Sequence, residues 1–231
     1  MNLQSQFRKY VRTYPQWHFV PPHVQVQRRL ERFGTEYGGY YLAPSRMRPN
    51  AVVYSVGIGE DISFDRSLIE TFGVEIEAFD PTPKVKEWLA LQALPKEFHF
   101  HAMGIADSDG EAEFHLPPRN DWVSHSMISA RQYSRETASF PVWRLGTAMA
   151  RLGHSRIDVL KMDIEGAEYG VIADIVRTQI PVGQLLVEFH HRLSAFGTGD
   201  TRRAIARLED YGMKIAYVCP RMEVFTFLQA G

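Results

Sequence analysis

The segment VLKMDIEGAEYGVI, residues 159–172, reads as a buried strand that turns into a helix. Its apolar start belongs to the run IDVLKM (157–162), which is typical of a strand covered on both faces, and a helix is expected over 165–177. Asp163, Glu165 and Glu168 stand at this junction. Carboxylates are favoured where a helix begins, because its first N–H groups are unpaired, so helix capping alone would account for them.

Strands and helices alternate along most of the chain. Short apolar runs predict strands at 51–56, 74–79, 97–103, 157–162, 184–189, 213–219 and 223–229. The last two are separated by only three residues, which makes them antiparallel neighbours, since a parallel crossover needs a dozen or more. The pattern predicts an α/β fold: a seven-stranded, mostly parallel, doubly wound sheet with a C-terminal antiparallel hairpin and helices on both faces.

Two segments depart from the alternation. A helix is expected from Pro21 and Pro22 to Gly34, as an N-terminal cap on the core. After the third strand, a short hairpin arm turning at Gly110 is expected, followed by a long polar loop over 117–140. We treat 1–231 as one domain, with 1–48 as a helical cap and lead-in and 49–231 as the core.

The charge balance argues against some partners. The chain has 26 basic and 27 acidic residues and a formal net charge of -1. No overall positive field exists to attract a phosphate backbone, so nucleic acid is not the expected partner. No run has the apolar length of a signal peptide or membrane span, which predicts a cytoplasmic protein without a membrane partner.

The loop after the first core strand, SVGIGEDISF (55–64), holds two glycines, Gly57 and Gly59, that suit close approach to a ligand. A dinucleotide fingerprint would carry a third glycine where this chain has Ile62. Glu60 and Asp61 in the same loop would repel a pyrophosphate. A nucleoside with cationic groups would be attracted instead, and S-adenosylmethionine fits through its sulfonium and ammonium.

Asp80 ends the second core strand, 21 positions after Gly59, where an acidic side chain can accept the hydroxyls of a ribose. The alternative is that Asp80 only organises the DPTP turn (80–83).

Four segments together resemble the FkbM-type family of S-adenosylmethionine-dependent methyltransferases over about residues 34–190: VVYSVGIGEDISFD (52–65), EAFDPTP (77–83), MGIADSDGEAEFH (103–115) and IDVLKMDIEGAEYGVI (157–172). The most specific piece is similar to the family's Lys-hydrophobic-Asp-hydrophobic-Glu-Gly-Ala-Glu signature, matched here at Lys161, Asp163, Glu165, Gly166, Ala167 and Glu168. The resemblance implies a class I methyltransferase, Rossmann-like fold.

The resemblance also implies roles for residues in the cofactor site. Gly57 and Gly59 would approach the cofactor, Asp80 would hold its ribose, and the loop of Gly104, Ile105 and Asp107 would lie near the adenine. Many class I enzymes carry an acidic residue where this chain has Ser55. Some of the contact to the methionine amino group would then come from Glu60, Asp61 or Asp163.

Members of the family mostly methylate hydroxyl groups of sugars or small natural products, so the resemblance implies a small hydroxylated acceptor. Such a transfer needs alignment and removal of the hydroxyl proton. His190, with an ordinary pKa near 6.5, is the first candidate base, and Asp163, Glu188 and Glu165 are further catalytic candidates. A rim histidine that only bonds a backbone carbonyl is the plain alternative. His191 is expected at the surface.

A divalent ion held by Asp163, Glu188 and His190 is a less favoured alternative. The long loop is expected to offer Ser124, His125 and Ser126 as a lid over the substrate, with Trp122 as a flat face for a sugar or ring. The alternative is an irregular loop with one anchoring tryptophan.

Two other functions compete with this reading. Methylation of a base nitrogen in nucleic acid would want an Asn/Asp-Pro-Pro-aromatic motif after the fourth strand, where this chain has DIEG (163–166). A non-catalytic nucleoside-binding or scaffold protein on the same fold is the other alternative.

Overall fold

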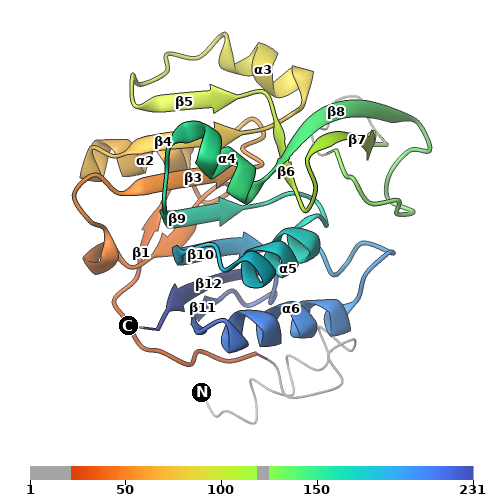
Figure 1. The fold of residues 1–231 in the computed structure, drawn as a ribbon. Helices are drawn as coiled ribbons and strands as arrows, with labels where there is room; N and C mark the ends of the chain where they lie inside the picture. Colours follow the sequence, from red (N-terminus) through yellow and green to blue (C-terminus); the bar gives the residue numbers. More distant parts are fainter. Residues whose placement is uncertain (1–21, 119–124, 231) are drawn as a thin grey trace.

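The structure is a computed structural model that describes residues 22–118 and 125–230. Its centre is a seven-stranded sheet with the strand order β11-β12-β10-β9-β3-β4-β5 (Figure 1). The strands are β3 (Val52–Val56), β4 (Glu75–Phe79), β5 (Phe98–His101), β9 (Ile157–Met162), β10 (Val182–Glu188), β11 (Met213–Val218) and β12 (Val224–Gln229). All seven lie within or close to the runs predicted from the sequence.

The sheet is parallel except at its C-terminal hairpin. β3 pairs in parallel with β4 and β9, β4 pairs in parallel with β5, and β9 pairs in parallel with β10. β12 runs antiparallel to both β10 and β11. The predicted sheet and its terminal hairpin are therefore confirmed.

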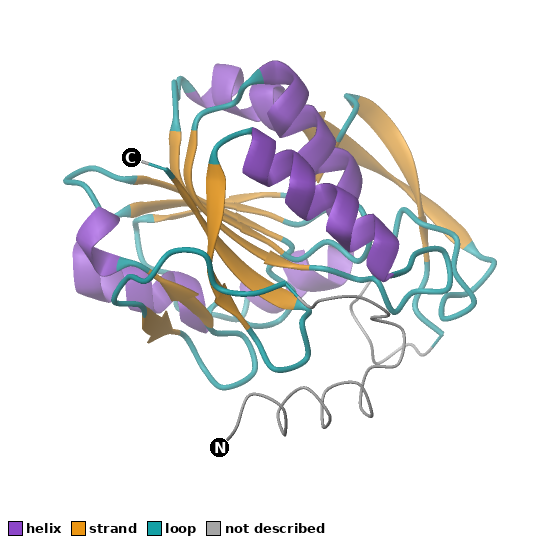
Figure 2. Cartoon of the chain, turned by 90° about the horizontal axis from the view of Figure 1, so that it is seen from below, coloured by secondary structure: helices purple, strands orange, loops and turns teal. Residues whose placement is uncertain are grey.

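Helices cover both faces of the sheet, as predicted (Figure 2). On one face, α2 (Ser63–Phe72) and α3 (Pro83–Leu89) share a core with β1 (Glu31–Phe33) and β2 (Tyr40–Leu42). On the other face lie α4 (Leu145–Leu152), α5 (Glu168–Thr178) and α6 (Thr198–Asp210). Successive β3 side chains divide between the two cores, Val53 to the first and Tyr54 to the second, because neighbouring residues of a strand point to opposite faces.

The predicted N-terminal helix is wrong for the residues that the structure describes. Residues 22–30 are irregular, β1 (Glu31–Phe33) pairs antiparallel with β2 (Tyr40–Leu42), and a short 3-10 helix, η1, follows at Pro44–Arg46. The N–H groups of Gln25 and Val26 donate to the Ile215 carbonyl at 2.8 and 3.1 Å. These N–H groups therefore donate to β11 and not to carbonyls within a helix.

The segment after β5 differs from the prediction in its pairing. β6 (Gly104–Ala106), β7 (Gly110–His115) and β8 (Thr137–Arg144) form a three-stranded sheet in the order β6-β8-β7. The expected hairpin arm thus pairs with β8, and residues 137–140, which were predicted to belong to the long loop, are part of this strand. Phe140 packs edge-on against Phe114 of β7 with ring centroids 5.3 Å apart, and Val142 is buried. These β-branched and aromatic side chains favour a strand.

A buried acid on α2 leads to a first prediction. Asp65 is 1% exposed, and burial raises the pKa of its carboxyl to about 6, although Lys161 nearby lowers it. A carboxyl whose pKa is higher in the folded than in the unfolded state makes folding less favourable above that pKa, and the effect fades as the pH falls toward 4. We expect Asp65→Asn to be more stable than the wild type at pH 7.5 by about 1–3 kcal/mol, and by less at pH 5.

The measurement is urea unfolding of both proteins at the two pH values. Glu70→Gln, an exposed site on the same helix, serves as the control and is expected to show no such change. A difference between Asp65→Asn and the wild type that is the same at both pH values would contradict the assignment.

Candidate active site

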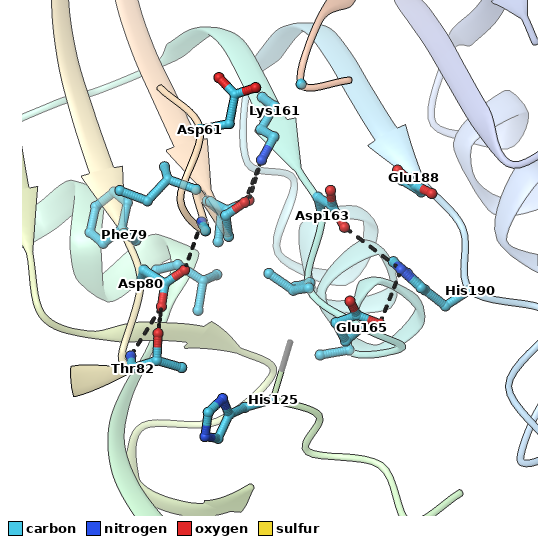
Figure 3. Close-up of a pocket in the computed structure, with 18 of the residues that line it drawn as sticks. Asp61, Phe79, Asp80, Thr82, His125, Lys161, Asp163, Glu165, Glu188 and His190 are labelled. Carbon is cyan, nitrogen blue, oxygen red and sulfur yellow. Dashed lines mark hydrogen bonds and ion pairs between the residues drawn. The ribbon is translucent and has the colours of Figure 1, made fainter. Parts of the chain in front are cut away.

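A cavity of about 540 Å³ lies at the carboxyl ends of β3, β4, β9 and β10, where most of the predicted residues meet (Figure 3). Its volume falls in the range of about 300–1,000 Å³ common for small-molecule sites. Its wall carries the acidic residues Glu36, Glu60, Asp61, Asp80, Asp163, Glu165, Glu188 and Glu223. Among the described residues of the same wall, Lys161 and Arg221 are the permanently charged basic ones, which gives this part of the wall an acidic excess.

The loop after β3, residues 57–61, forms one side of the cavity and is called the glycine loop. Gly57 and Gly59 have φ angles of 72° and 55°, in the left-handed region that favours glycine. A Cβ on Gly57 would lie 1.7 Å from the Asp163 carbonyl oxygen, so the loop packs directly against the end of β9.

Lys161 fixes the same loop. It is 6% exposed, and its ammonium donates to the Gly57 carbonyl and, at 3.5 Å, to the Val56 carbonyl. The sequence indicated Lys161 only as part of a signature, and the structure gives it the role of holding the glycine loop.

Asp80 organises the turn and borders the cavity. Its Oδ1 accepts hydrogen bonds from the Thr82 N–H at 3.0 Å and the Thr82 hydroxyl at 2.6 Å, and its Oδ2 accepts from the Gly59 N–H at 3.2 Å. Burial raises the pKa of Asp80 against the lowering effect of these bonds. A carboxylate oxygen accepts about two hydrogen bonds, so Oδ2 retains capacity for one more.

The other predicted cofactor residues divide into two groups. Glu60, Asp61, Gly104 and Ile105 line the cavity, where Phe79 and Phe114 add apolar surface. Hydrogen bonds from Ser63 and Thr35 lower the pKa of Asp61 in spite of its partial burial. Asp107 does not line the cavity, because its carboxylate lies against Gly170 of α5, where a Cβ would come within 2.9 Å of it.

A polar cluster forms the opposite side of the cavity (Figure 3). The Nε2 atom of His190 lies 3.7 Å from Asp163 Oδ1 and 3.3 Å from Glu165 Oε2. Its Nδ1 atom lies 2.5 Å from Glu168 Oε1. Glu188 lines the same side, so the structure brings together all four predicted catalytic residues.

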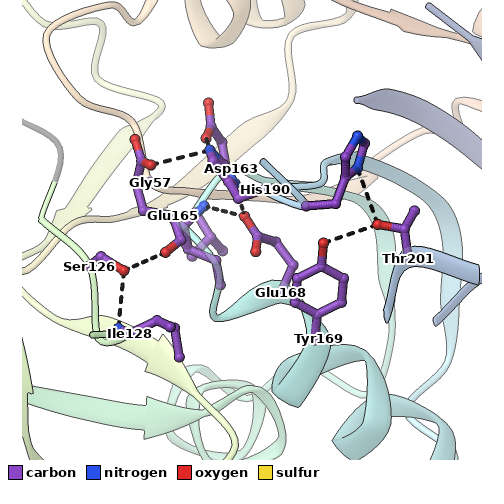
Figure 4. Close-up of polar contacts among 12 residues, drawn as sticks. Gly57, Ser126, Ile128, Asp163, Glu165, Glu168, Tyr169, His190 and Thr201 are labelled. Carbon is purple, nitrogen blue, oxygen red and sulfur yellow. Dashed lines mark hydrogen bonds and ion pairs between the residues drawn. The ribbon is translucent and has the colours of Figure 1, made fainter. Parts of the chain in front are cut away.

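Glu168 is buried below this cluster, with 0% of its side chain exposed (Figure 4). Its Oε1 also accepts a hydrogen bond from the Ile164 N–H at 3.2 Å. This bond ties Glu168 to the turn before α5 and does not cap the helix, because Ile164 lies outside it and α5 has no side-chain cap among the described residues. The contact with His190 is an addition that the sequence did not indicate.

The turn that carries Glu165 has an unusual backbone. Glu165 and Gly166 have φ angles of 51° and 103°, and a Cβ on Gly166 would lie 2.8 Å from the Phe196 ring. This left-handed turn delays the start of α5 to Glu168, three residues later than predicted. It also directs the Glu165 carboxylate toward His190 (Figure 4).

The long loop supports this turn. The Ser126 hydroxyl donates to the Glu165 carbonyl at 2.6 Å, and the Tyr133 hydroxyl donates to Glu165 Oε2 at 2.7 Å. Ser126 is 0% exposed and therefore supports the site from behind, which corrects its prediction as a lid residue. His125 lines the cavity. Trp122 and Ser124 lie outside the described residues.

The pKa of His190 is far from its ordinary value. Burial lowers it, but the carboxylates of Glu168, Glu165 and Asp163 outweigh burial and raise it well above the usual range. The expectation of an unperturbed histidine is therefore wrong. Burial, followed by the charge of Asp163, raises the pKa of Glu188 to about 7.

The prediction that His191 lies at the surface is also wrong. It is only 4% exposed, and its Nδ1 lies 3.2 Å from the Thr201 hydroxyl. Burial lowers its pKa to about 4. His191 is a core residue of the α6 side rather than a surface residue.

The sheet order and the placement of the cavity define a class I methyltransferase fold. The antiparallel β12 lies between β10 and β11, and the cavity opens at the ends of the parallel strands. The chain belongs to the FkbM methyltransferase family, because the family model described as "Methyltransferase FkbM domain" matches residues 48–215.

Curated relatives include the human and rat proteins described as "Probable methyltransferase-like protein 24". Each is 27% identical to this chain over 158 residues, which is 67% of this chain and 37% of the relative. The chain thus spans little more than a third of the length of these relatives.

Solved structures that align with this chain include two fibrillarins. The Methanococcus jannaschii protein aligns with a TM-score of 0.47 at 11% identity, covering 91% of this chain and 87% of its own. The Aeropyrum pernix protein, which has natively bound S-adenosyl-L-methionine, aligns with a TM-score of 0.45 at 13% identity, covering 88% and 84%. Within the described ranges, no helix combines the length and apolar character needed to cross a membrane.

Proposed function

We propose that this protein transfers a methyl group from S-adenosylmethionine to a hydroxyl group of a small molecule, either a sugar or a natural product. One observation carries the proposal. The glycine loop with Asp80 and the cluster of Asp163, Glu165, Glu188 and His190 line opposite sides of one cavity. Family membership supplies the reaction class, methyl transfer.

The cavity wall fits the cofactor. Gly57 and Gly59 expose backbone to it, and the Asp80 Oδ2 atom can accept a ribose hydroxyl. Phe79, Ile105 and Phe114 offer apolar surface for the adenine. The acidic excess attracts a sulfonium and an ammonium and repels a pyrophosphate. When bound, the cofactor would supply an electrophilic methyl group to the acceptor.

The polar cluster fits the acceptor. In an in-line displacement the protein's task is to align the hydroxyl oxygen with the methyl carbon and to take up the hydroxyl proton. Asp163, Glu165 and Glu188 offer carboxylate oxygens, and His190 offers an imidazole nitrogen, on the side of the cavity facing the glycine loop. We assign Asp163, Glu165 and His190 to binding the acceptor and Glu188, whose pKa is raised to about 7, to taking up its proton. The raised pKa of His190 disfavours the neutral imidazole that a base requires.

The cofactor assignment predicts the effect of Asp80→Ala on binding. The substitution removes the proposed ribose contact and the bonds that hold Gly59 and Thr82, so S-adenosylhomocysteine is expected to bind about 10- to 100-fold more weakly. Calorimetric titration of S-adenosylhomocysteine and of NAD measures the difference. Asp107→Ala, an acidic residue outside the cavity, is the matched control and is expected to bind like the wild type.

Tighter binding of NAD than of S-adenosylhomocysteine, or equal affinity of wild type and Asp80→Ala, would refute the cofactor assignment. Cofactor binding without any methylated product across a panel of hydroxylated compounds would favour a nucleoside-binding scaffold.

A further inference from the structure

We propose that Asp163, Glu165 and His190 bind a hard divalent cation such as Mg²⁺ or Mn²⁺ on the acceptor side of the cavity. Binding of the ion is inferred from the distances between these three side chains and from the contacts that orient them. Its role in holding the acceptor oxygen rests on the proposed function. The ligand set differs from the one considered from the sequence, because Glu165 takes the place of Glu188.

The distances suit a shared ion. One ligand atom from each of the three residues lies within 4.8 Å of the others. The His190 Nε2 atom is 3.3 Å from Glu165 Oε2 and 3.7 Å from Asp163 Oδ1. In an octahedral site with metal–ligand distances of about 2.1 Å, adjacent ligand atoms are about 3 Å apart, so only small side-chain shifts are needed. Three protein ligands leave positions open for water or an acceptor oxygen.

The first line of support is how His190 is oriented. Metal-bound histidines commonly donate their second ring N–H to a carboxylate, which aims the other nitrogen at the ion. Here the carboxylate is Glu168, with 0% side-chain exposure, and its Oε1 lies 2.5 Å from Nδ1. The Nε2 atom is thereby turned toward Asp163 and Glu165 (Figure 4).

The two carboxylate ligands are held in a similar way. The Tyr40 hydroxyl, on a residue only 4% exposed, donates to Asp163 Oδ2 at 3.2 Å, which leaves Oδ1 facing His190. The Tyr133 hydroxyl donates to Glu165 Oε2 at 2.7 Å. All three ligands therefore have a partner that restricts their rotation, as is expected of a preorganised ion site.

The second line of support is unbalanced charge. Asp163, Glu165, Glu168 and Glu188 stand around one imidazole, and within the described residues no other basic side chain forms an ion pair with them. Lys161 directs its ammonium to the Gly57 carbonyl instead. The Oε2 atom of Glu168 is buried without a hydrogen-bond partner. Carboxylates at such density are commonly offset by a bound cation, whose charge dominates the local field.

The ion would also be well placed for the proposed reaction. Asp163 is the residue whose backbone packs against Gly57 of the cofactor loop. An acceptor oxygen bound to the ion would therefore lie in the same cavity as the loop proposed to hold the methyl donor. A divalent ion makes a bound hydroxyl a stronger acid, which assists its deprotonation.

The test is a titration of the purified, metal-stripped protein with Mn²⁺, followed by electron paramagnetic resonance. We expect one Mn²⁺ per chain, with a nitrogen coupling from His190 in the pulsed spectrum. Asp163→Asn, Glu165→Gln and His190→Gln are each expected to weaken binding at least 10-fold, and His190→Gln also removes the nitrogen coupling. Glu168→Gln is expected to weaken it about 10- to 100-fold.

Asp107→Asn is the control, since it removes a carboxylate near the same sheet edge but outside the cavity, and its Mn²⁺ affinity should match the wild type. Failure of the wild-type protein to bind Mn²⁺, Mg²⁺ or Zn²⁺ stoichiometrically would overturn the proposal, as would Mn²⁺ binding without a nitrogen coupling. Mn²⁺ is titrated without cofactor and S-adenosylhomocysteine without metal, so either assignment can fail while the other stands.

Discussion

Replacing Gly57 by alanine is expected to lower the free energy of unfolding by about 2–5 kcal/mol and to abolish cofactor binding. The φ angle of 72° places Gly57 in the left-handed region, where a Cβ costs about 1–2 kcal/mol. The Cβ would also lie 1.7 Å from the Asp163 carbonyl oxygen, so β9 would have to move away from the glycine loop. That movement would displace Asp163 from the cavity wall.

Gly73 provides a matched control for this substitution. It ends α2 with a φ angle of 63°, and no atom lies within 4 Å of the position of its Cβ. Gly73→Ala therefore shows the backbone cost alone, about 1–2 kcal/mol. Urea unfolding gives the stability of both variants, and calorimetry gives their affinity for S-adenosylhomocysteine. If Gly57→Ala is no less stable than Gly73→Ala, the close contact with Asp163 does not constrain the loop.

The second large effect is expected from Glu168→Ala. Its carboxylate is fully buried and serves both the His190 ring and the Ile164 N–H. Removing one partner of a buried charged pair costs about 3–5 kcal/mol, because the other partner remains buried without compensation. Urea unfolding at neutral pH measures the loss.

A double-mutant cycle separates the pair from general packing effects. We expect Glu168→Ala and His190→Ala to be non-additive by about 0.5–3 kcal/mol, since each removes the same contact. Glu111→Ala, an exposed acid on β7, is the control and is expected to add independently to His190→Ala. Additive effects of Glu168→Ala and His190→Ala would show that the two side chains do not depend on each other.

The central sheet was predictable because its signals are local. Each parallel strand is a short apolar run, and the three-residue connection before the last strand leaves only an antiparallel pairing. The segment at 22–34 shows the limit of such signals. Its proline and glycine positions resemble a helix start and stop, yet its backbone bonds are made to Ile215, about 190 residues away. Only the assembled fold supplies that partner.

The sequence predicted where the site lies but not which side chains contact one another within it. The ends of parallel strands share one edge, so Asp80, Asp163 and His190 were expected near one another. The pairing of Glu168 with His190 depends on a left-handed turn at Glu165 that moves the helix start by three residues. The sequence analysis expected Glu168 at a regular helix start instead. The raised pKa of His190 was not expected either, since it comes from its contacts with Glu168 and Glu165.

The position of β12 has a consequence for how the chain is assembled. This strand is the last in sequence, yet it lies inside the sheet and pairs with both β10 and β11. During synthesis, one edge of β10 stays open and β11 has no partner strand in the sheet until residues 224–229 have been translated. The seven-stranded sheet can therefore be completed only after this segment has been translated, because β12 is the strand that joins β11 to β10.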